Sequence, residues 1–237
     1  MASRSAMVPT LRSLVARVPG ARAAARFLAD RLAASDSDTD TRLLREAYAI
    51  GMTQKWGEIR GLITLVRELR PRRVLEIGTA SGGTLYVWTR LAGDEATLIS
   101  LDLPSDGTDE GAERAMLERW RRFARGVQRL HFLRMDSHSH AARQEVLRLL
   151  EGESLDFLFI DGDHSWEGVR RDVADYTPLV RPGGLVAFHD IHPHPKGWGG
   201  EVPRFWAEIR GQHAVVELVE DQGQEGFGIG VVRVERG

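Results

Sequence analysis

The sequence predicts an α/β protein with a doubly wound, mostly parallel sheet of seven strands, a C-terminal antiparallel hairpin and an N-terminal helical extension. Two observations predict the sheet. From Pro71 onward, short apolar runs of strand length alternate with amphipathic helical patterns, as expected for parallel strands covered by helices on both faces. Near the C-terminal end, two β-rich runs follow each other with only a glycine-containing turn between them, which predicts the hairpin.

The composition excludes several classes of protein. The chain has 237 residues, which suits one domain with an extension. Its formal net charge of −2 supplies no overall basic field for nucleic acid, and no apolar run approaches the roughly 20 residues of a membrane span. Because the sequence has no cysteine, it has no disulfide, no thiolate metal site and no cysteine nucleophile. This composition also fits a cytoplasmic location.

The first 34 residues differ from the rest of the chain. They are rich in arginine and carry a single acid, Asp30, and Pro19-Gly20 divides them into two short helical patterns. We interpret them as a helical arm that packs on the domain or on another copy in a homo-oligomer; a targeting or membrane-surface helix is the alternative. Residues 35–40 are polar and form a linker. The predicted organisation is an arm and linker over 1–40 and one domain over 41–237.

The elements of the domain follow in order. A helical pattern runs from Thr41 to Leu69, and Pro71 ends it. The apolar runs that predict strands are 74–77, 97–101, 130–133, 155–160 and 185–188, followed by the two β-rich runs 214–219 and 227–234. Helical patterns lie between these runs. One begins at residue 84, two cover 111–126 and 139–150, and one begins at 166 and is closed by Pro182-Gly183-Gly184. A last helical pattern begins at residue 204.

A glycine-rich turn follows the first strand and opens a helix at Thr84. Glycines at 78, 82 and 83 allow a ligand to approach the backbone closely, and the helix N-terminus offers free N–H groups. Ala80 breaks the spacing of a dinucleotide site. Glu76, just before the turn, disfavours a pyrophosphate and suits a ligand with a positive amino group. A tight turn required only for packing is the alternative.

Acidic residues end the next two strands. Asp102 and Leu103 end the second strand, where a carboxylate suits the hydroxyls of a ribose. Asp136 and Ser137 follow the third strand, where they suit the amino group of an adenine. Because the carboxyl ends of parallel strands share one rim of the sheet, we expect these residues to face the same ligand as the glycine turn.

These motifs, with FIDGDHS at 159–165, LVRPGG at 179–184 and FHDI at 188–191, resemble the class I S-adenosylmethionine-dependent methyltransferases. The sequence is most similar to their small-molecule O-methyltransferase group, which includes macrolide-sugar methyltransferases and cephalosporin-hydroxylase-like proteins. The resemblance covers about residues 45–235 and implies a Rossmann-like sheet. It implies that S-adenosylmethionine binds to Glu76, Gly78, Thr79, Ser81, Gly82, Gly83, Asp102, Leu103, Asp136, Ser137 and Asp161.

Polar residues also follow the fourth and fifth strands. The resemblance implies a divalent cation, Mg²⁺ first, held by Asp161, His189 and Asp190. His189 stands where metal-dependent members of the group have a carboxylate, and its imidazole also allows Mn²⁺, Zn²⁺ or Fe²⁺.

His164 is the candidate general base for methylation of a hydroxyl, with Asp161 as the second catalytic residue, because the hydroxyl loses a proton as its oxygen attacks. The alternative is that His164 caps the following helix and Asp163 starts its turn. The loop 192–203, which contains His192 and His194, is expected to cover the substrate.

The first prediction of function is a metal-assisted, S-adenosylmethionine-dependent O-methyltransferase that acts on a hydroxyl of a small natural product or sugar. A non-haem iron oxygenase that uses Asp161, His164 and His189 is the alternative. A nicotinamide oxidoreductase is disfavoured by the broken glycine spacing, and a non-enzymatic scaffold on the same fold is a further alternative.

Overall fold

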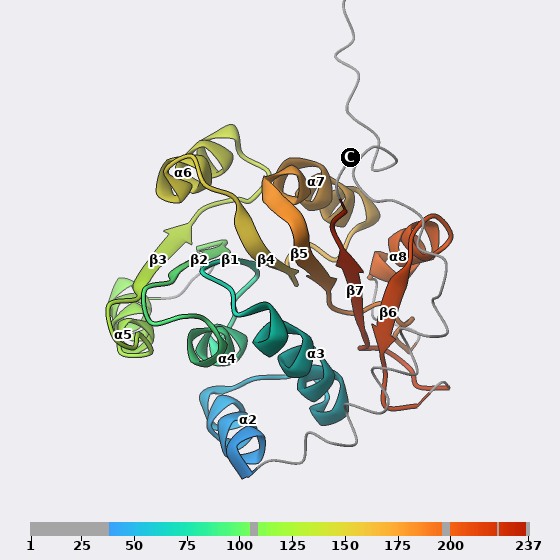
Figure 1. Ribbon diagram of the computed structural model, residues 1–237, viewed down its shortest axis with the longest axis horizontal. Helices are drawn as coiled ribbons and strands as arrows, with labels where there is room; N and C mark the ends of the chain where they lie inside the picture. Colours follow the sequence, from blue (N-terminus) through green and yellow to red (C-terminus); the bar gives the residue numbers. More distant parts are fainter. Residues whose placement is uncertain (1–37, 105–108, 196–199, 222, 236–237) are drawn as a thin grey trace, which may run out of the picture.

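The computed structural model of the chain describes residues 38–104, 109–195, 200–221 and 223–235. Its strands form one sheet in the order β3-β2-β1-β4-β5-β7-β6 (Figure 1). The strands are β1 (Arg73–Ile77), β2 (Thr97–Asp102), β3 (Arg129–Arg134), β4 (Leu155–Ile160), β5 (Val180–Phe188), β6 (Val215–Leu218) and β7 (Ile229–Arg233). Strands β1 to β5 are parallel, while β7 pairs antiparallel with both β5 and β6. The predicted seven-stranded, mostly parallel sheet and its C-terminal antiparallel hairpin are confirmed.

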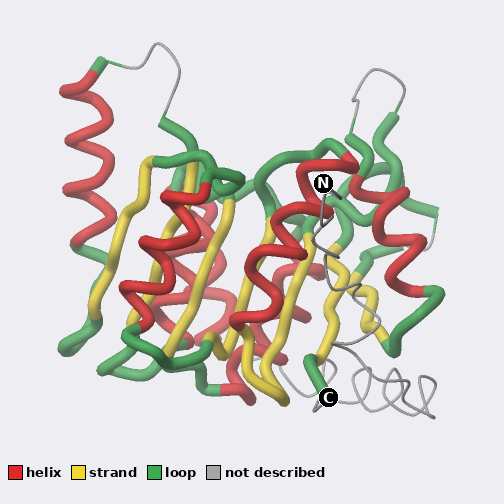
Figure 2. Tube along the Cα trace, turned by 90° about the horizontal axis from the view of Figure 1, so that it is seen from above, coloured by secondary structure: helices red, strands yellow, loops and turns green. Residues whose placement is uncertain are grey.

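Helices cover both faces of the sheet (Figures 1 and 2). One side carries α2 (Asp38–Ile50), α3 (Trp56–Leu69), α4 (Gly83–Leu91) and α5 (Glu110–Arg121). The other side carries α6 (His140–Leu150), α7 (Trp166–Tyr176), the short 3₁₀ turn η2 (Thr177–Leu179) and α8 (Val202–Arg210). No helix in the described ranges is long and apolar enough to cross a membrane.

Strand β4 lies at the centre of the core and is buried along its whole length. Leu158 and Ile160 belong to the apolar cluster shared with α6, α7 and α8, while Phe157 and Phe159 belong to the cluster shared with α3 and α4. Trp88 of α4 contacts both phenylalanines edge-on, with ring centroids 5.0 and 5.4 Å away. A continuous apolar run is typical of a parallel strand that is covered on both faces, which is why this strand was predictable.

The helical pattern predicted over 41–69 is two helices. α2 begins at Asp38, inside the predicted linker, and ends at Ile50, and α3 begins only at Trp56. Gly51 has a φ of +117°, a backbone conformation that glycine adopts readily and that ends a helix. The break over residues 51–55 brings the chain to the rim of the sheet. The predicted arm, residues 1–34, lies outside the described residues.

Other boundaries also differ from the sequence prediction. Helix α5 ends at Arg121, before the predicted end at 126. The segment Pro182-Gly183-Gly184 does not close the preceding helix but bulges within β5, because the register with β4 passes from Leu155↔Val180 to Phe157↔Leu185. Strand β7 begins at Ile229 because the two residues before it have positive φ values, which an extended strand does not accommodate.

The carboxyl ends of β1 to β5 share one end of the sheet, and the loops that follow them gather there (Figure 2). Ligands of doubly wound sheets bind outside the carboxyl ends of the strands. The candidate site is therefore at this rim.

Candidate active site

The glycines of the turn after β1 are required by packing as well as by any ligand. A Cβ on Gly78 would lie 2.0 Å from the carbonyl oxygen of Asp161, and its φ is +81°. A Cβ on Gly82 would lie 2.3 Å from the Trp120 indole nitrogen, and one on Gly83 would lie 2.6 Å from Met52. Only glycine fits these positions, so packing alone explains the three glycines, and the ligand explanation stays a prediction.

Asp102 holds the turn from the neighbouring strand. Its Oδ2 accepts hydrogen bonds from the backbone N–H groups of Thr79, at 3.1 Å, and Ala80, at 3.0 Å. The guanidinium of Arg134 lies 3.4 Å from the same oxygen. Asp102 thus fixes the backbone that a cofactor would contact, and the residue itself lines the cavity.

A cavity of about 760 Å³ opens at this rim, a size typical of small-molecule sites. Its wall contains these residues named by the sequence analysis: Gly78, Thr79, Ser81, Gly83, Asp102, Leu103, Asp136, Ser137, Asp161, Asp163, His164, His189, Asp190 and His194. Glu76 and Gly82 do not lie on the wall. The structure therefore brings the glycine turn, the strand-end acids and the histidine cluster together around one space.

Glu76 lies beneath the turn and is completely buried. Its Oε1 accepts a hydrogen bond of 2.7 Å from the Trp88 indole. Desolvation by burial raises the pKa of Glu76 to about 7, because it disfavours the charged form more than the neighbouring donors favour it. The sequence predicts that Glu76 contacts a ligand's amino group. Its buried position away from the cavity wall does not favour that contact.

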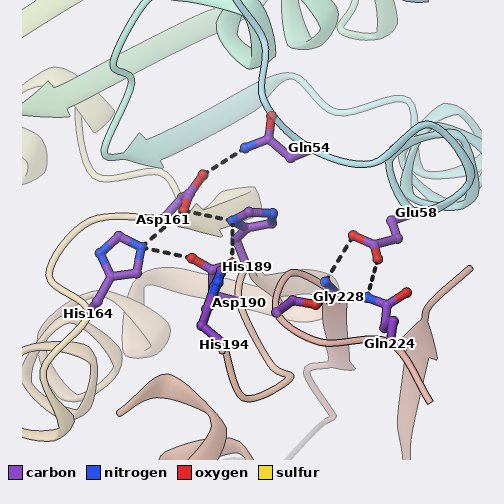
Figure 3. Close-up of polar contacts among 10 residues, drawn as sticks. Gln54, Glu58, Asp161, His164, His189, Asp190, His194, Gln224 and Gly228 are labelled. Atoms are coloured by element: carbon purple, nitrogen blue, oxygen red, sulfur yellow. Dashed lines mark hydrogen bonds and ion pairs between the residues drawn. The ribbon is translucent and has the colours of Figure 1, made fainter. Parts of the chain in front are cut away.

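Two aspartates and two histidines meet where β4 and β5 end (Figure 3). His189 Nδ1 lies 3.1 Å from Asp161 Oδ1 and 3.4 Å from Asp190 Oδ1. His164 Nε2 lies 2.9 Å from Asp190 Oδ2 and 3.9 Å from Asp161 Oδ1. Asp190 has a φ of +59°, which is rare for a residue with a side chain and is typical of strained functional positions.

The charges of this cluster support one another. The hydrogen bond to Asp190 raises the pKa of His164, although burial opposes the change. Burial alone would lower the pKa of His189, but Asp161 and Asp190 outweigh it and raise that pKa to about 10. Burial would raise the pKa of Asp190, yet hydrogen bonds from the surrounding histidines hold it well below its usual range. The two carboxylates therefore raise the pKa values of the histidines beside them.

The donor atoms that converge differ from the predicted metal set. Asp161, His164 and Asp190 each offer a ligand atom, and these atoms lie within 4.8 Å of one another. His189 faces two of these residues and is buried behind them. One imidazole and two carboxylates suit a divalent cation, Mn²⁺ or Zn²⁺ as readily as Mg²⁺.

His164 does not cap helix α7. The cap is Ser165, whose hydroxyl accepts the backbone N–H of Gly168 at 3.0 Å. Asp163 does start the turn, because its Oδ1 accepts the N–H of Ser165 at 2.8 Å. The capping alternative for His164 is therefore wrong, and its side chain points toward Asp161 and Asp190 (Figure 3).

Sequence reasoning missed the contribution of the break between α2 and α3. Residues 51–54 line the cavity, and Gln54 Nε2 donates a hydrogen bond of 2.8 Å to Asp161 Oδ2. The signal that could have found this break is Gly51, which interrupts the apolar pattern of the two helices. Met135 and His138 also line the cavity and were not singled out.

The turn before β7 supplies a further part of the wall. Phe227 lines the cavity, and its backbone has a φ of +58°. Its ring contacts the rings of His189 and His194, with centroid distances of 5.9 and 5.6 Å. Buried Glu58 holds this turn by accepting the N–H of Gly228 at 2.9 Å and an amide hydrogen of Gln224 at 2.6 Å (Figure 3). His194 Nε2 lies 2.9 Å from Asp190 Oδ1, so His194 joins the cluster.

Comparison with known proteins agrees with this geometry. Residues 75–191 match a family described as a methyltransferase domain. A stretch of 152 residues, 61% of this chain, is 33% identical to the uncharacterized protein y4gI of Sinorhizobium fredii, and the match spans only 16% of that protein's length.

Two solved structures share the fold. The MycE methyltransferase from the mycinamycin biosynthetic pathway, in complex with Mg, SAH and mycinamycin VI, is 21% identical with a TM-score of 0.55, covering 85% of this chain and 56% of that one. The SAH-bound methyltransferase PaMTH1 of Podospora anserina is 17% identical with a TM-score of 0.55, covering 93% of this chain and 99% of that one.

The fold, the glycine turn and the family match together define a methyltransferase domain. Residues 75–191 are similar to a methyltransferase domain, and the described part of the chain has the fold of solved methyltransferases that bind S-adenosylhomocysteine. The oxygenase alternative is not supported: its three residues do lie together, but the family match falls on a methyltransferase domain.

Proposed function

We propose that this enzyme transfers the methyl group of S-adenosylmethionine to a hydroxyl of a small molecule, a natural product or a sugar, with His164 as the general base. The observation that carries the proposal is that one cavity joins the glycine turn and Asp102 to the His164–Asp190 pair. Solved methyltransferases of this fold support the choice of reaction, since MycE was crystallised with a mycinamycin.

The cofactor fits the described residues. The cavity is large enough for a nucleoside with an amino-acid arm, and the backbone of the glycine turn forms part of its wall. We propose that Asp102 binds the ribose hydroxyls and that Asp136 and Ser137 bind the adenine. The backbone of residues 78–83 would contact the rest of S-adenosylmethionine. Glu76 supports the turn from below through Trp88. Bound S-adenosylmethionine would supply a methyl group on a sulfonium, and the neutral thioether, S-adenosylhomocysteine, would be a good leaving group.

His164 takes the proton of the acceptor hydroxyl. Asp190 lies within hydrogen-bond distance of Nε2, so it fixes the hydrogen on that atom and leaves Nδ1 of the neutral ring as the acceptor. The raised pKa of His164 strengthens it as a base. The protein's remaining task is to position the acceptor, since proximity and orientation are the largest contributions that it can make.

A divalent cation fits this site, because Asp161 and Asp190 offer it carboxylate oxygens. We propose that these two carboxylates hold it, while His164 acts as the base. A bound cation supplies positive charge beside the acceptor oxygen and so favours loss of its proton. Gln54 and His189 orient Asp161 by contacting different oxygens of its carboxylate.

The test is a transfer assay with radiolabelled S-adenosylmethionine and a panel of hydroxylated natural products and sugars. We expect labelled product with at least one acceptor, inactivation by EDTA and recovery with Mg²⁺ or Mn²⁺. Transfer that EDTA leaves unchanged overturns the metal part alone.

Because the chain has no cysteine, we propose that the enzyme works in the reducing cytoplasm.

A further inference from the structure

The loop that follows β3 is held in place from behind by helix α7. The Tyr176 hydroxyl donates a hydrogen bond of 2.7 Å to the carbonyl of Ser137, and the Arg171 guanidinium donates to the carbonyl of His138. Asp136 closes the loop by accepting the N–H of His138 at 2.8 Å. These contacts come from the protein alone and do not require a ligand.

The ring of His138 lies on the cavity wall and has one defined tautomer. Its Nε2 lies 3.2 Å from the carbonyl oxygen of Gly168 and 3.3 Å from Oδ1 of the fully buried Asp172. A carbonyl oxygen only accepts hydrogen bonds, and a carboxylate beside it reinforces the need for a donor. Nε2 therefore carries the hydrogen, and Nδ1 of the neutral ring is an acceptor.

This acceptor lies beside a second one. His138 Nδ1 is 3.7 Å from Oδ1 of Asp136, which the proposed function already assigns to the adenine. An amino group with two hydrogens is matched to a pair of neighbouring acceptors, whereas an oxo group in its place would face two lone pairs and repel both.

We propose that His138 determines the base specificity of the cofactor site: with Asp136, it accepts the exocyclic amino group of adenine and rejects a 6-oxo purine. Asp172 is a positioning residue that fixes the His138 tautomer from behind. The inference rests on the proposed function, since it requires an adenosyl cofactor in this cavity.

Calorimetric titration of the whole protein with S-adenosylhomocysteine and S-inosylhomocysteine tests it. We expect the adenine compound to bind at least about 100-fold more tightly, because a polar site rejects a ligand that leaves its groups unpaired. In His138→Leu the affinity for S-adenosylhomocysteine falls about tenfold, the worth of one hydrogen bond, and the preference shrinks by at least as much. His140→Leu is the matched control, since His140 is exposed, lies two residues away and is not on the cavity wall.

Nitrogen NMR of the unmodified protein gives a readout that does not depend on how a variant folds. His138 Nδ1 should resonate as an unprotonated nitrogen and shift on binding of S-adenosylhomocysteine, but not of S-inosylhomocysteine. In Asp172→Asn the population of the other tautomer should rise. A protonated Nδ1, or equal binding of the two compounds, overturns the inference and leaves the proposed function intact. Failure of the unmodified protein to bind S-adenosylhomocysteine overturns both.

Discussion

His164 and Asp190 form the contact on which the proposed chemistry depends. A hydrogen bond of 2.9 Å to a nearly buried carboxylate orients the imidazole and strengthens it as a base. His189, one residue before Asp190, lies against the carboxylates of Asp161 and Asp190. His164 after β4 and His189 after β5 thus have different surroundings and different proposed roles.

Replacing His164 by alanine separates the base from a metal ligand. We expect turnover to slow by ~10²–10⁴-fold, the usual contribution of general-base catalysis. Affinities for S-adenosylhomocysteine and Mn²⁺, measured by calorimetry, should stay close to those of the unmodified enzyme. His140→Ala, at an exposed position, should change neither rate nor affinity. Loss of Mn²⁺ binding in His164→Ala would instead make His164 a metal ligand.

Glu76 predicts a pH-dependent stability. Its folded-state pKa of about 7 exceeds the ordinary value of 4.5, so the folded state binds the proton more tightly than the unfolded state. The contribution of Glu76 is complete below pH 4.5 and is lost as pH rises through 7, to the extent of about 3 kcal/mol.

Glu76→Gln keeps the acceptor for Trp88 but cannot ionise. Its free energy of unfolding, relative to that of the unmodified protein, should therefore increase between pH 5 and pH 8. Urea unfolding across that pH range measures the difference, and a difference independent of pH would mean that Glu76 is not buried as described.

At the scale of elements, the glycine turn is built as much by its neighbours as by its own sequence. Trp120 of α5 is fully buried, and its indole donates to the carbonyl of Ser81 at 3.0 Å, directly over Gly82. Helix α5 therefore sets the shape of a turn that precedes α4.

Gly82→Ala tests this packing. The new Cβ would collide with the Trp120 indole at a residue whose φ is +87°, and we expect a loss of about 2 kcal/mol or more in unfolding free energy. Gly93→Ala is the control, because a Cβ there meets no atom within 4 Å, and it should stay within about 0.5 kcal/mol. Equal effects of the two substitutions, measured by chemical denaturation, would contradict the packing described.

The elements that were predictable are those whose signal is local. The buried run of β4, the end of β2 at Asp102 and the start of α4 all follow from adjacent residues. Gln54 was not predictable, because its contact with Asp161 joins positions 107 residues apart in a break within one apparent helical pattern. The sequence predicts a strand at Phe227, because aromatic residues favour strands, but Phe227 and the glycines on either side of it have positive φ values and form a turn.

At the scale of the whole molecule, the described part of the cavity wall draws on segments from Gly51 to Phe227, and these segments include the glycine turn and the acids at the strand ends. A chain that begins at Ser35 should therefore fold and bind S-adenosylhomocysteine with the affinity of the full chain. Calorimetry on both proteins measures this. A truncated chain that is folded by circular dichroism yet does not bind would show that the arm completes the cofactor site.

The sheet gathers one carboxylate from each of several strands, and Asp102 is the one that links the glycine turn to the proposed cofactor. The decisive measurement is the affinity for S-adenosylhomocysteine of Asp102→Ala, with Asp94→Ala, a surface position before β2, as control. The account predicts a loss of about tenfold or more in the first variant, because a charge-assisted hydrogen bond disappears, and none in the second. Unchanged affinity in a folded Asp102→Ala protein would contradict it.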